Sequence, residues 1–346
     1  MSVRKSSVVW SLLGILLIVG AVVIRFAVLP SLTKLPEDLA QTQKYEGTMQ
    51  AVNPQAFAAG DLANLLTPEM PITADRSLTV DAVDGDVAIV TSKAVLSLPD
   101  ASTQNDVHTY AVNRDDYSPA RIDEAQRNSL VPADKQASFE EHAGLAFSWP
   151  MDPPKDGTAL YDSVTRSAQP ATFVDESELE GRTVYNFRID AAGEITSPTV
   201  LAQFKDFPTQ LPKQVVDGLL QAGIVPEKSR AAVAAALPSL PDLVPVGFGS
   251  TNQIDAAVDA EFGAPLLVRQ TQGMYVTVDA GGQDLPVLPL SIVKLHTADS
   301  EVSAAADTMS KNSTLLSILG LWLPVAMVVI GIGLLVLGIA RRRRTA

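Results

Sequence analysis

Two long uncharged stretches, one near each end of the chain, constrain this sequence more than any other feature. Val8–Ile24 has no ionisable side chain, and after Arg25 the apolar residues continue to Leu29. Leu315–Ala340 is a run of 26 residues without an ionisable side chain, interrupted by Pro324. At about 1.5 Å per residue, each stretch can cross the ~30 Å hydrocarbon core of a bilayer. We therefore predict one transmembrane helix at each end.

Positive charges beside the two stretches predict their orientation. Arg4 and Lys5 precede the first, and four arginines, Arg341–Arg344, follow the second. Because basic residues next to a span favour the cytoplasmic side, both termini should be cytoplasmic and the protein should lie in the plasma membrane. A cleaved signal peptide is the alternative for the first stretch, but no A-x-A cleavage site follows it. The predicted order is a cytoplasmic end (1–7), a helix (8–29), an extracytoplasmic domain (30–314), a helix (315–340) and an arginine-rich cytoplasmic tail (341–346).

The exported segment is strongly acidic and carries little catalytic chemistry. Residues 30–314 hold 19 basic and 39 acidic side chains, a net charge of −20, which argues against nucleic acid as a partner. The chain has no cysteine and three histidines, His108, His142 and His296. Nucleophile-elbow, P-loop and HExxH patterns are absent, and the acidic pairs are those that composition alone would give. We expect no enzymatic activity, cofactor or metal.

Alternating polar and apolar residues predict strands in this segment, most clearly over Arg182–Asp190. Two stretches from Pro212 to Leu237, the first with apolar residues at helical spacing and the second rich in alanine, predict a helical hairpin. Each begins at a proline, and the first ends at a glycine. The fold class is α+β, a β-rich exported domain with a helical cap. Residues 117–135 should form a surface loop, and Ala137–His142 and Ser300–Met309 should be short helices. The other expected strands are Glu46–Val52, Arg76–Val80, Asp86–Leu98, Val107–Asn113, Leu266–Gln270, Met274–Asp279 and Leu288–His296.

Several short motifs stand out in and around the middle of the chain. They are Phe147 to Pro150, Tyr161–Asp162, Gly181 with Tyr185 and Phe187, the HTYAVNR stretch at 108–114 and the Thr-Ala-x-Arg of residues 73–76. With these motifs the chain resembles an actinobacterial family of two-pass membrane proteins known as porin PorA-like. The family pattern is lost at Tyr275–Gly281, where a proline and a threonine are missing. The layout also resembles class B scavenger receptors, which have two terminal helices around a β-rich domain. The resemblance to the PorA-like family implies an envelope protein linked to the maturation of lipoglycans such as lipomannan.

Three hypotheses of function follow. In the first, the exported domain binds or conducts a lipid or lipid-linked glycan, through aromatic residues and the apolar face of the hairpin. In the second, the chain is a non-enzymatic scaffold or regulator of envelope glycosyltransferases, held by the small-residue faces of its membrane helices. A glycan-modifying enzyme ranks last. Ordinary core packing is the alternative role for the aromatic residues. The candidate ligand-lining residues are Phe147, Trp149, Tyr161, Tyr185, Phe187, Val215, Val216, Leu219 and Leu220.

Overall fold

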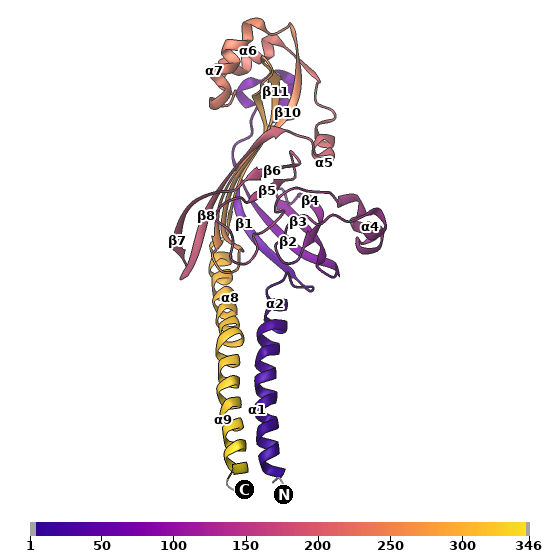
Figure 1. Ribbon diagram of the computed structural model, residues 1–346. Helices are drawn as coiled ribbons and strands as arrows, with labels where there is room; N and C mark the ends of the chain where they lie inside the picture. Colours follow the sequence, from indigo (N-terminus) through magenta and orange to yellow (C-terminus); the bar gives the residue numbers. More distant parts are fainter. Residues whose placement is uncertain (1–4, 344–346) are drawn as a thin grey trace. The chain divides into compact units, whose positions relative to one another are not determined.

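The computed structural model describes residues 5–343, which fall into two compact units. The segments Met1–Pro36 and Ala304–Ala346 make one unit, and Glu37–Ser303 makes the other. The first contains the apolar helices and the second a large antiparallel sheet with short helices (Figure 1). The α+β class is therefore confirmed. Arg4 and Arg344, which contribute to the predicted orientation, lie outside the described residues.

Both predicted terminal helices are present. Two helical stretches, Leu12–Leu32 and Asp299–Ala340, are long and apolar enough to cross a membrane. Many of their large apolar side chains are exposed, among them Leu16 and Val329, as contact with lipid requires. Near the N-terminus the order is α1 (Lys5–Val23), a π-helical turn (Ile24–Val28) and α2 (Leu29–Leu32), and near the C-terminus it is α8 (Asp299–Ser317), a π-helical turn (Ile318–Trp322) and α9 (Leu323–Arg343).

The two π-helical turns lie directly before the prolines of these helices. Pro324 has no N–H and its ring crowds the carbonyl one turn earlier, so a regular helix would be interrupted there. Instead Leu323 donates its N–H to the Ile318 carbonyl, five residues back. Leu29, beside Pro30, does the same to Ile24. The wider turn lets each helix continue through its proline.

Close glycine contacts join α1 and α9. A Cβ atom added to Gly14 would lie 2.5 Å from the Gly331 carbonyl oxygen, and one on Gly331 would lie 2.8 Å from the Gly14 oxygen. Small residues thus allow the two backbones to touch. The sequence suggested that such glycines bind another membrane protein. In the structure Gly14 and Gly331 form the contact between α1 and α9 of the same chain, whereas Gly333 has open space around it.

The second unit is built on one antiparallel sheet whose strand order is β4-β3-β2-β1-β12-β11-β10-β8-β7, with β9 beside β10. A separate β5–β6 pair completes the strands. Because β1 pairs with β12, the two ends of the domain meet in the middle of the sheet. The strands are β1 (Ala40–Ala51), β2 (Met70–Asp84), β3 (Val87–Ser97), β4 (Thr103–Asn113), β5 (Ala159–Asp162), β6 (Ser167–Pro170), β7 (Thr172–Leu179), β8 (Arg182–Glu194), β9 (Gln210–Pro212), β10 (Leu243–Asp259), β11 (Pro265–Asp279) and β12 (Asp284–Thr297).

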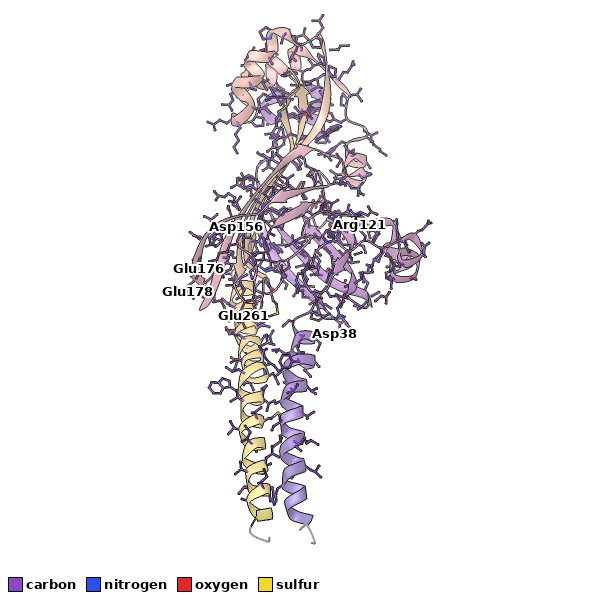
Figure 2. All side chains as sticks on the ribbon, in the orientation of Figure 1. Asp38, Arg121, Asp156, Glu176, Glu178 and Glu261 are labelled. Atoms are coloured by element: carbon purple, nitrogen blue, oxygen red, sulfur yellow. The ribbon has the colours of Figure 1, made fainter. Side chains whose placement is uncertain are left out.

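The predicted strands are all found, with two differences. Leu266–Gln270 and Met274–Asp279 are parts of one strand, β11, which is irregular in register after Met274. Strands β5, β6, β7, β9 and β10 were not predicted. Strands β5, β6 and β9 are only three or four residues long, β7 is rich in acids and β10 contains glycines. On β7, Glu176 and Glu178 lie at the edge of the sheet (Figure 2), where charge discourages pairing with another chain.

The predicted helical hairpin is confirmed as α6 (Lys213–Gln221) and α7 (Glu227–Ala236). It covers one end of the sheet, where both helices contact β12 (Figure 1). The apolar side chains of the hairpin and of β10 to β12 form one buried cluster there. Its fully or almost fully buried members are Leu65, Leu211, Val216, Leu219, Val225, Val233, Leu240, Val244, Val276, Val278, Val287, Leu288 and Leu290.

Two local predictions were wrong. The expected loop at 117–135 contains α4 (Glu124–Leu130), which begins with a capping box between Asp123 and Gln126. The helix expected at Ala137–His142 is instead a 3₁₀ turn, Ala133–Ser138, followed by irregular chain. The remaining short elements are α3 (Pro54–Ala59), α5 (Pro198–Leu201) and 3₁₀ turns at Leu62–Asn64, Ala202–Phe204 and Leu237–Ser239.

Candidate functional site

The five aromatic residues expected to line a ligand site pack against other protein side chains. Trp149 is buried and stacks on Phe187, with 5.0 Å between ring centroids. Tyr185 contacts Phe173 beside them, and Phe147 is buried against Tyr117. Tyr161 lies elsewhere, in the polar cluster described below. These contacts are those of ordinary core residues.

The four hairpin residues belong to a different part of the domain. Val216 and Leu219 are fully buried in the apolar cluster under the helices, and Val215 and Leu220 pack against it, partly buried. The structure therefore does not bring the nine predicted residues together. They occupy two separate apolar clusters and one polar cluster.

A buried polar cluster joins β4 to the segment that follows α4. The imidazole of His108 lies between two carboxylates, with Nε2 2.8 Å from Asp106 Oδ1 and Nδ1 2.7 Å from Glu140 Oε1. The Tyr161 hydroxyl donates to the other Glu140 oxygen at 3.4 Å. Burial lowers the pKa of His108, but hydrogen bonds and charge from the two carboxylates outweigh it and raise the pKa to about 9. His108 is thus a cation held in place at neutral pH.

His142 lies in the same cluster but in an apolar setting. Its ring is 4.9 Å from that of Tyr110 and 5.8 Å from that of Tyr161, measured between centroids. Its Nε2 atom is buried and has no hydrogen-bond partner in the described part of the chain. Burial lowers the pKa of His142 to about 4, against a smaller opposing effect of the Glu140 charge. His142 is therefore a neutral core residue at neutral pH.

The His108 ion pairs predict a loss of stability in alkaline solution. Because the folded-state pKa of about 9 exceeds the ordinary value of 6.5, this stabilisation is complete below pH 6.5 and disappears as pH rises through 9. We expect the free energy of unfolding to fall by about 2 kcal/mol over this range, less than the full shift implies because Asp106 is largely exposed. Denaturant unfolding of the full chain in detergent should show this fall in wild type and in His296→Gln, and not in His108→Gln. Equal slopes for all three proteins would contradict it.

Several residues that carried the family resemblance hold segments of chain to the sheet. Asp162 is buried and accepts hydrogen bonds from the Thr165 amide and hydroxyl and from Asn252 on β10. Arg114 pairs with Glu37 at 2.9 Å. These contacts give the recognisable motifs a structural role.

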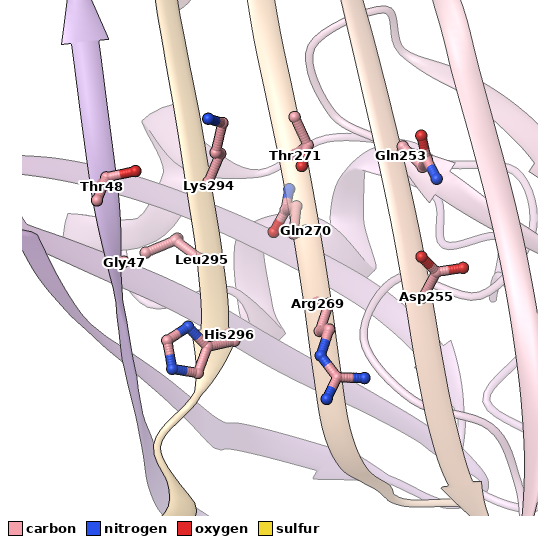
Figure 3. A pocket seen from close by; sticks show the side chains of 10 residues that line it. All are labelled: Gly47, Thr48, Gln253, Asp255, Arg269, Gln270, Thr271, Lys294, Leu295 and His296. Atoms are coloured by element: carbon pink, nitrogen blue, oxygen red, sulfur yellow. The ribbon is translucent and has the colours of Figure 1, made fainter. Parts of the chain in front are cut away.

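A second polar region lies on the exposed face of the sheet. It is a hollow of about 550 Å³ across β1, β12, β11 and β10, shown in Figure 3. A smaller hollow of about 310 Å³ continues it toward β8 and β7, and the two share Asp255 and Arg269. We call them together the polar groove. The larger hollow is lined by Gly47, Thr48, Gln253, Asp255, Arg269, Gln270, Thr271, Lys294, Leu295 and His296.

Strand register explains why these polar side chains gather. His296 is paired with Arg269, and Arg269 with Asp255, so the three form one row across the sheet. Lys294, Thr271 and Gln253 form the next row, two residues along each strand. Because side chains alternate between the faces of a strand, both rows point to the same side.

The sides of the polar groove are occupied by internal ion pairs. Lys294 Nζ lies 2.6 Å from Glu69, and Asp255 lies 2.8 Å from Nε of Arg188. Between them lie four side chains for which the described domain supplies no hydrogen-bond or ion-pair partner: Gln253, Arg269, Thr271 and His296. The centre of the groove therefore offers an amide, a guanidinium, a hydroxyl and an imidazole that are free to bond a ligand.

Sequence reasoning did not find this groove. The residues of its centre come from three short stretches, 253–255, 269–271 and 294–296, and the signal in each was a polar residue at alternate positions. The sequence does not show which strands pair, so the two cross-strand rows of polar side chains cannot be predicted without the structure.

A comparison with protein families decides where the chain belongs. A family model described as Porin PorA matches residues 6–340. The chain belongs to the porin PorA family. The resemblance seen in the middle of the sequence is thereby confirmed and extends over both terminal helices. With its two apolar helices, this member of the porin PorA family is a membrane protein.

Other comparisons add little to the family assignment. No curated protein matches the sequence. Among solved structures, Rv2717c from M. tuberculosis is similar at 8% identity over 74% of this chain and 91% of that one, with a TM-score of 0.21. Rv0216 from Mycobacterium tuberculosis, which has a double hotdog fold, is similar at 14% identity over 81% and 80%, with a TM-score of 0.17. TM-scores this low support no conclusion about this PorA-family protein.

Proposed function

We propose that this PorA-family protein binds the glycan part of a lipid-linked glycan in the polar groove of an exported domain, and so supports lipoglycan assembly of the lipomannan type. The observation that carries the proposal is the set of four uncommitted side chains in the groove centre. The groove lies on exposed parts of six strands, so an extended ligand can enter it without opening the fold.

The chemistry of the groove suits a glycan better than an acyl chain. Sugar hydroxyls donate and accept hydrogen bonds, and the groove centre offers both functions through Gln253 and Thr271. An acyl chain needs apolar walls instead. The apolar clusters under the hairpin and around Trp149 are filled by their own side chains. We therefore assign binding of the glycan head to this domain and leave conduction of the lipid out of the proposal.

The membrane topology completes the proposal. Basic residues beside both apolar helices favour cytoplasmic termini, so the sheet would face the side where envelope glycans are assembled. Binding alone accounts for the groove, and we propose a carrier or presenting role without catalysis. Envelope glycosyltransferases would then be the natural recipients of the bound glycan.

A binding assay on the full chain tests this proposal. Wild type in phosphatidylcholine nanodiscs should bind mannotriose, and the double variant Gln253→Ala with Thr271→Val should bind it about tenfold more weakly or worse, because each lost hydrogen bond costs about 0.5–1.5 kcal/mol. Thr103→Val with Gln104→Ala makes the same exchange at exposed positions of β4 and should bind as wild type does. The proposal fails if wild type does not bind, or if both double variants lose the same affinity.

A further inference from the structure

The charge pattern in the middle of the polar groove singles out Arg269. It lies on β11, and it is one of the two residues shared by both hollows. Across the sheet its paired neighbours are His296 on β12 and Asp255 on β10. Arg269 is thus surrounded on both sides by groove, and any ligand that spans the two hollows must pass it.

Two acids on this face are paired with other cations, whereas Glu46, in register with His296 and two strands from Arg269, has no ion pair in the described domain. Asp255 pairs with Arg188 on its other side at 2.8 Å, and Glu69 pairs with Lys294 at 2.6 Å. Arg269 itself has no carboxylate within ion-pair distance in the described domain. This is unusual in a segment with 39 acidic and 19 basic residues, where a surface arginine has many possible partners.

The other arginines of this domain show that an arginine without a bonding partner in the chain is unusual here. Seven of the nine bond to a side chain or a carbonyl of the chain, through contacts such as Arg182 with Asp259 and Arg230 with the Val225 carbonyl. The two that do not are Arg121 and Arg269. Arg121 is exposed (Figure 2) and does not line either hollow, so water can solvate it from all sides. Arg269 lines both hollows.

We infer that Arg269 and His296 bind an oxyanion of the ligand, a phosphate or a carboxylate. This inference rests on the proposed function and names the charged group of the same ligand. A guanidinium presents parallel N–H donors that match two oxygens of an oxyanion, and charge-assisted bonds of this kind are stronger than neutral ones. The His296 imidazole adds a donor from the neighbouring strand, about 5 Å away between paired Cβ atoms. The ion pairs of Asp255 and Glu69 keep two nearby negative charges neutralised.

The test compares two ligands that differ by one phosphate group. The full chain in phosphatidylcholine nanodiscs is titrated with mannotriose and with mannotriose carrying a phosphomonoester. Wild type should bind the phosphorylated form at least about tenfold more tightly. Arg269→Gln should lose this preference, because it should weaken binding of the phosphorylated form at least about tenfold more than it weakens binding of neutral mannotriose. Arg269→Lys, which keeps the charge and loses the fork, should retain part of the preference.

The matched control is Arg121→Gln, which removes the same charge outside the groove and should keep the full preference. Sodium phosphate and vesicles of phosphatidylglycerol compete in separate arms. Competition by the salt identifies free phosphate as a sufficient ligand, and competition by the vesicles alone identifies a lipid headgroup. Competition by neither contradicts the inference.

The inference is also overturned if Arg269→Gln weakens binding of both trisaccharides equally. Binding of neutral mannotriose without any preference would defeat the inference and leave the proposed function standing, whereas binding of neither sugar would defeat both.

Discussion

Asp259→Ala should lower the free energy of unfolding by about 3–5 kcal/mol, among the largest effects expected of a single substitution in this domain. The Asp259 carboxylate is completely buried at the end of β10. It accepts two bonds from Arg182, at 2.7 and 3.0 Å, and two more from the amides of Glu261 and Phe262 in the turn to β11. Its removal leaves two amide groups without their acceptor, and it leaves the largely buried guanidinium with Glu261, at 3.0 Å, as its remaining carboxylate partner.

The same strand provides the control for this prediction. Asp255 also pairs with an arginine, Arg188, but both side chains are roughly half exposed. Asp255→Ala should therefore cost less than about 1 kcal/mol. The two variants are compared with wild type by denaturant unfolding of the full chain in detergent, followed by tryptophan fluorescence. Equal losses for the two aspartates would show that burial does not set the strength of these ion pairs.

Gly331→Leu should separate the two membrane helices. The glycine leaves no room for a side chain, because its Cβ position lies 2.8 Å from the Gly14 carbonyl oxygen and 2.9 Å from a carbon of Ile18. A main-chain oxygen cannot move away by changing rotamer, so the helices must move apart toward the ~8–10 Å spacing of ordinary pairs. Gly333→Leu is the control, since no atom lies within 4 Å of its Cβ position.

Spin labels measure the helix separation directly, because the chain has no cysteine of its own. Labels on Leu16→Cys and Val329→Cys, both exposed, report the distance between α1 and α9. We expect Gly331→Leu to lengthen or broaden this distance by about 2 Å or more, and Gly333→Leu to leave it unchanged. An unchanged distance in Gly331→Leu would mean that the glycine contact does not hold the pair together.

Much of the fold could be predicted from the sequence because it depends on local patterns. Both terminal helices follow from uninterrupted apolar runs, and β8 follows from the alternation over Arg182–Asp190. Strand β10 gave no such signal. Its Gly247 and Gly249 weaken the strand pattern, yet they lie against Thr277 of β11, where a Cβ atom would come within 3.1 and 2.8 Å. This requirement exists only once β10 and β11 are paired.

The candidate site could not be predicted for a related reason. The sequence analysis selected aromatic residues as ligand-lining candidates, but Trp149 and Phe187 stack on one another in the core. The groove depends instead on common polar residues, whose importance arises from register. The position of Arg269 beside His296 is visible only once the strand register is known. The same holds for the Arg188–Asp255 ion pair, which occupies the carboxylate nearest to Arg269. Long-range strand pairing therefore determines both the groove and its charge pattern.

Native mass spectrometry of the full chain tests the central claim most directly. Wild type and the Gln253→Ala, Thr271→Val double variant are purified from the membranes of the same host in matched nanodiscs, and the masses that remain bound are compared. Our account predicts that wild type carries a lipid-linked glycan whose sugar fragments appear on activation, and that the variant has lost most of it. An adduct retained equally by the variant, or a wild-type protein that carries no glycan, would contradict it.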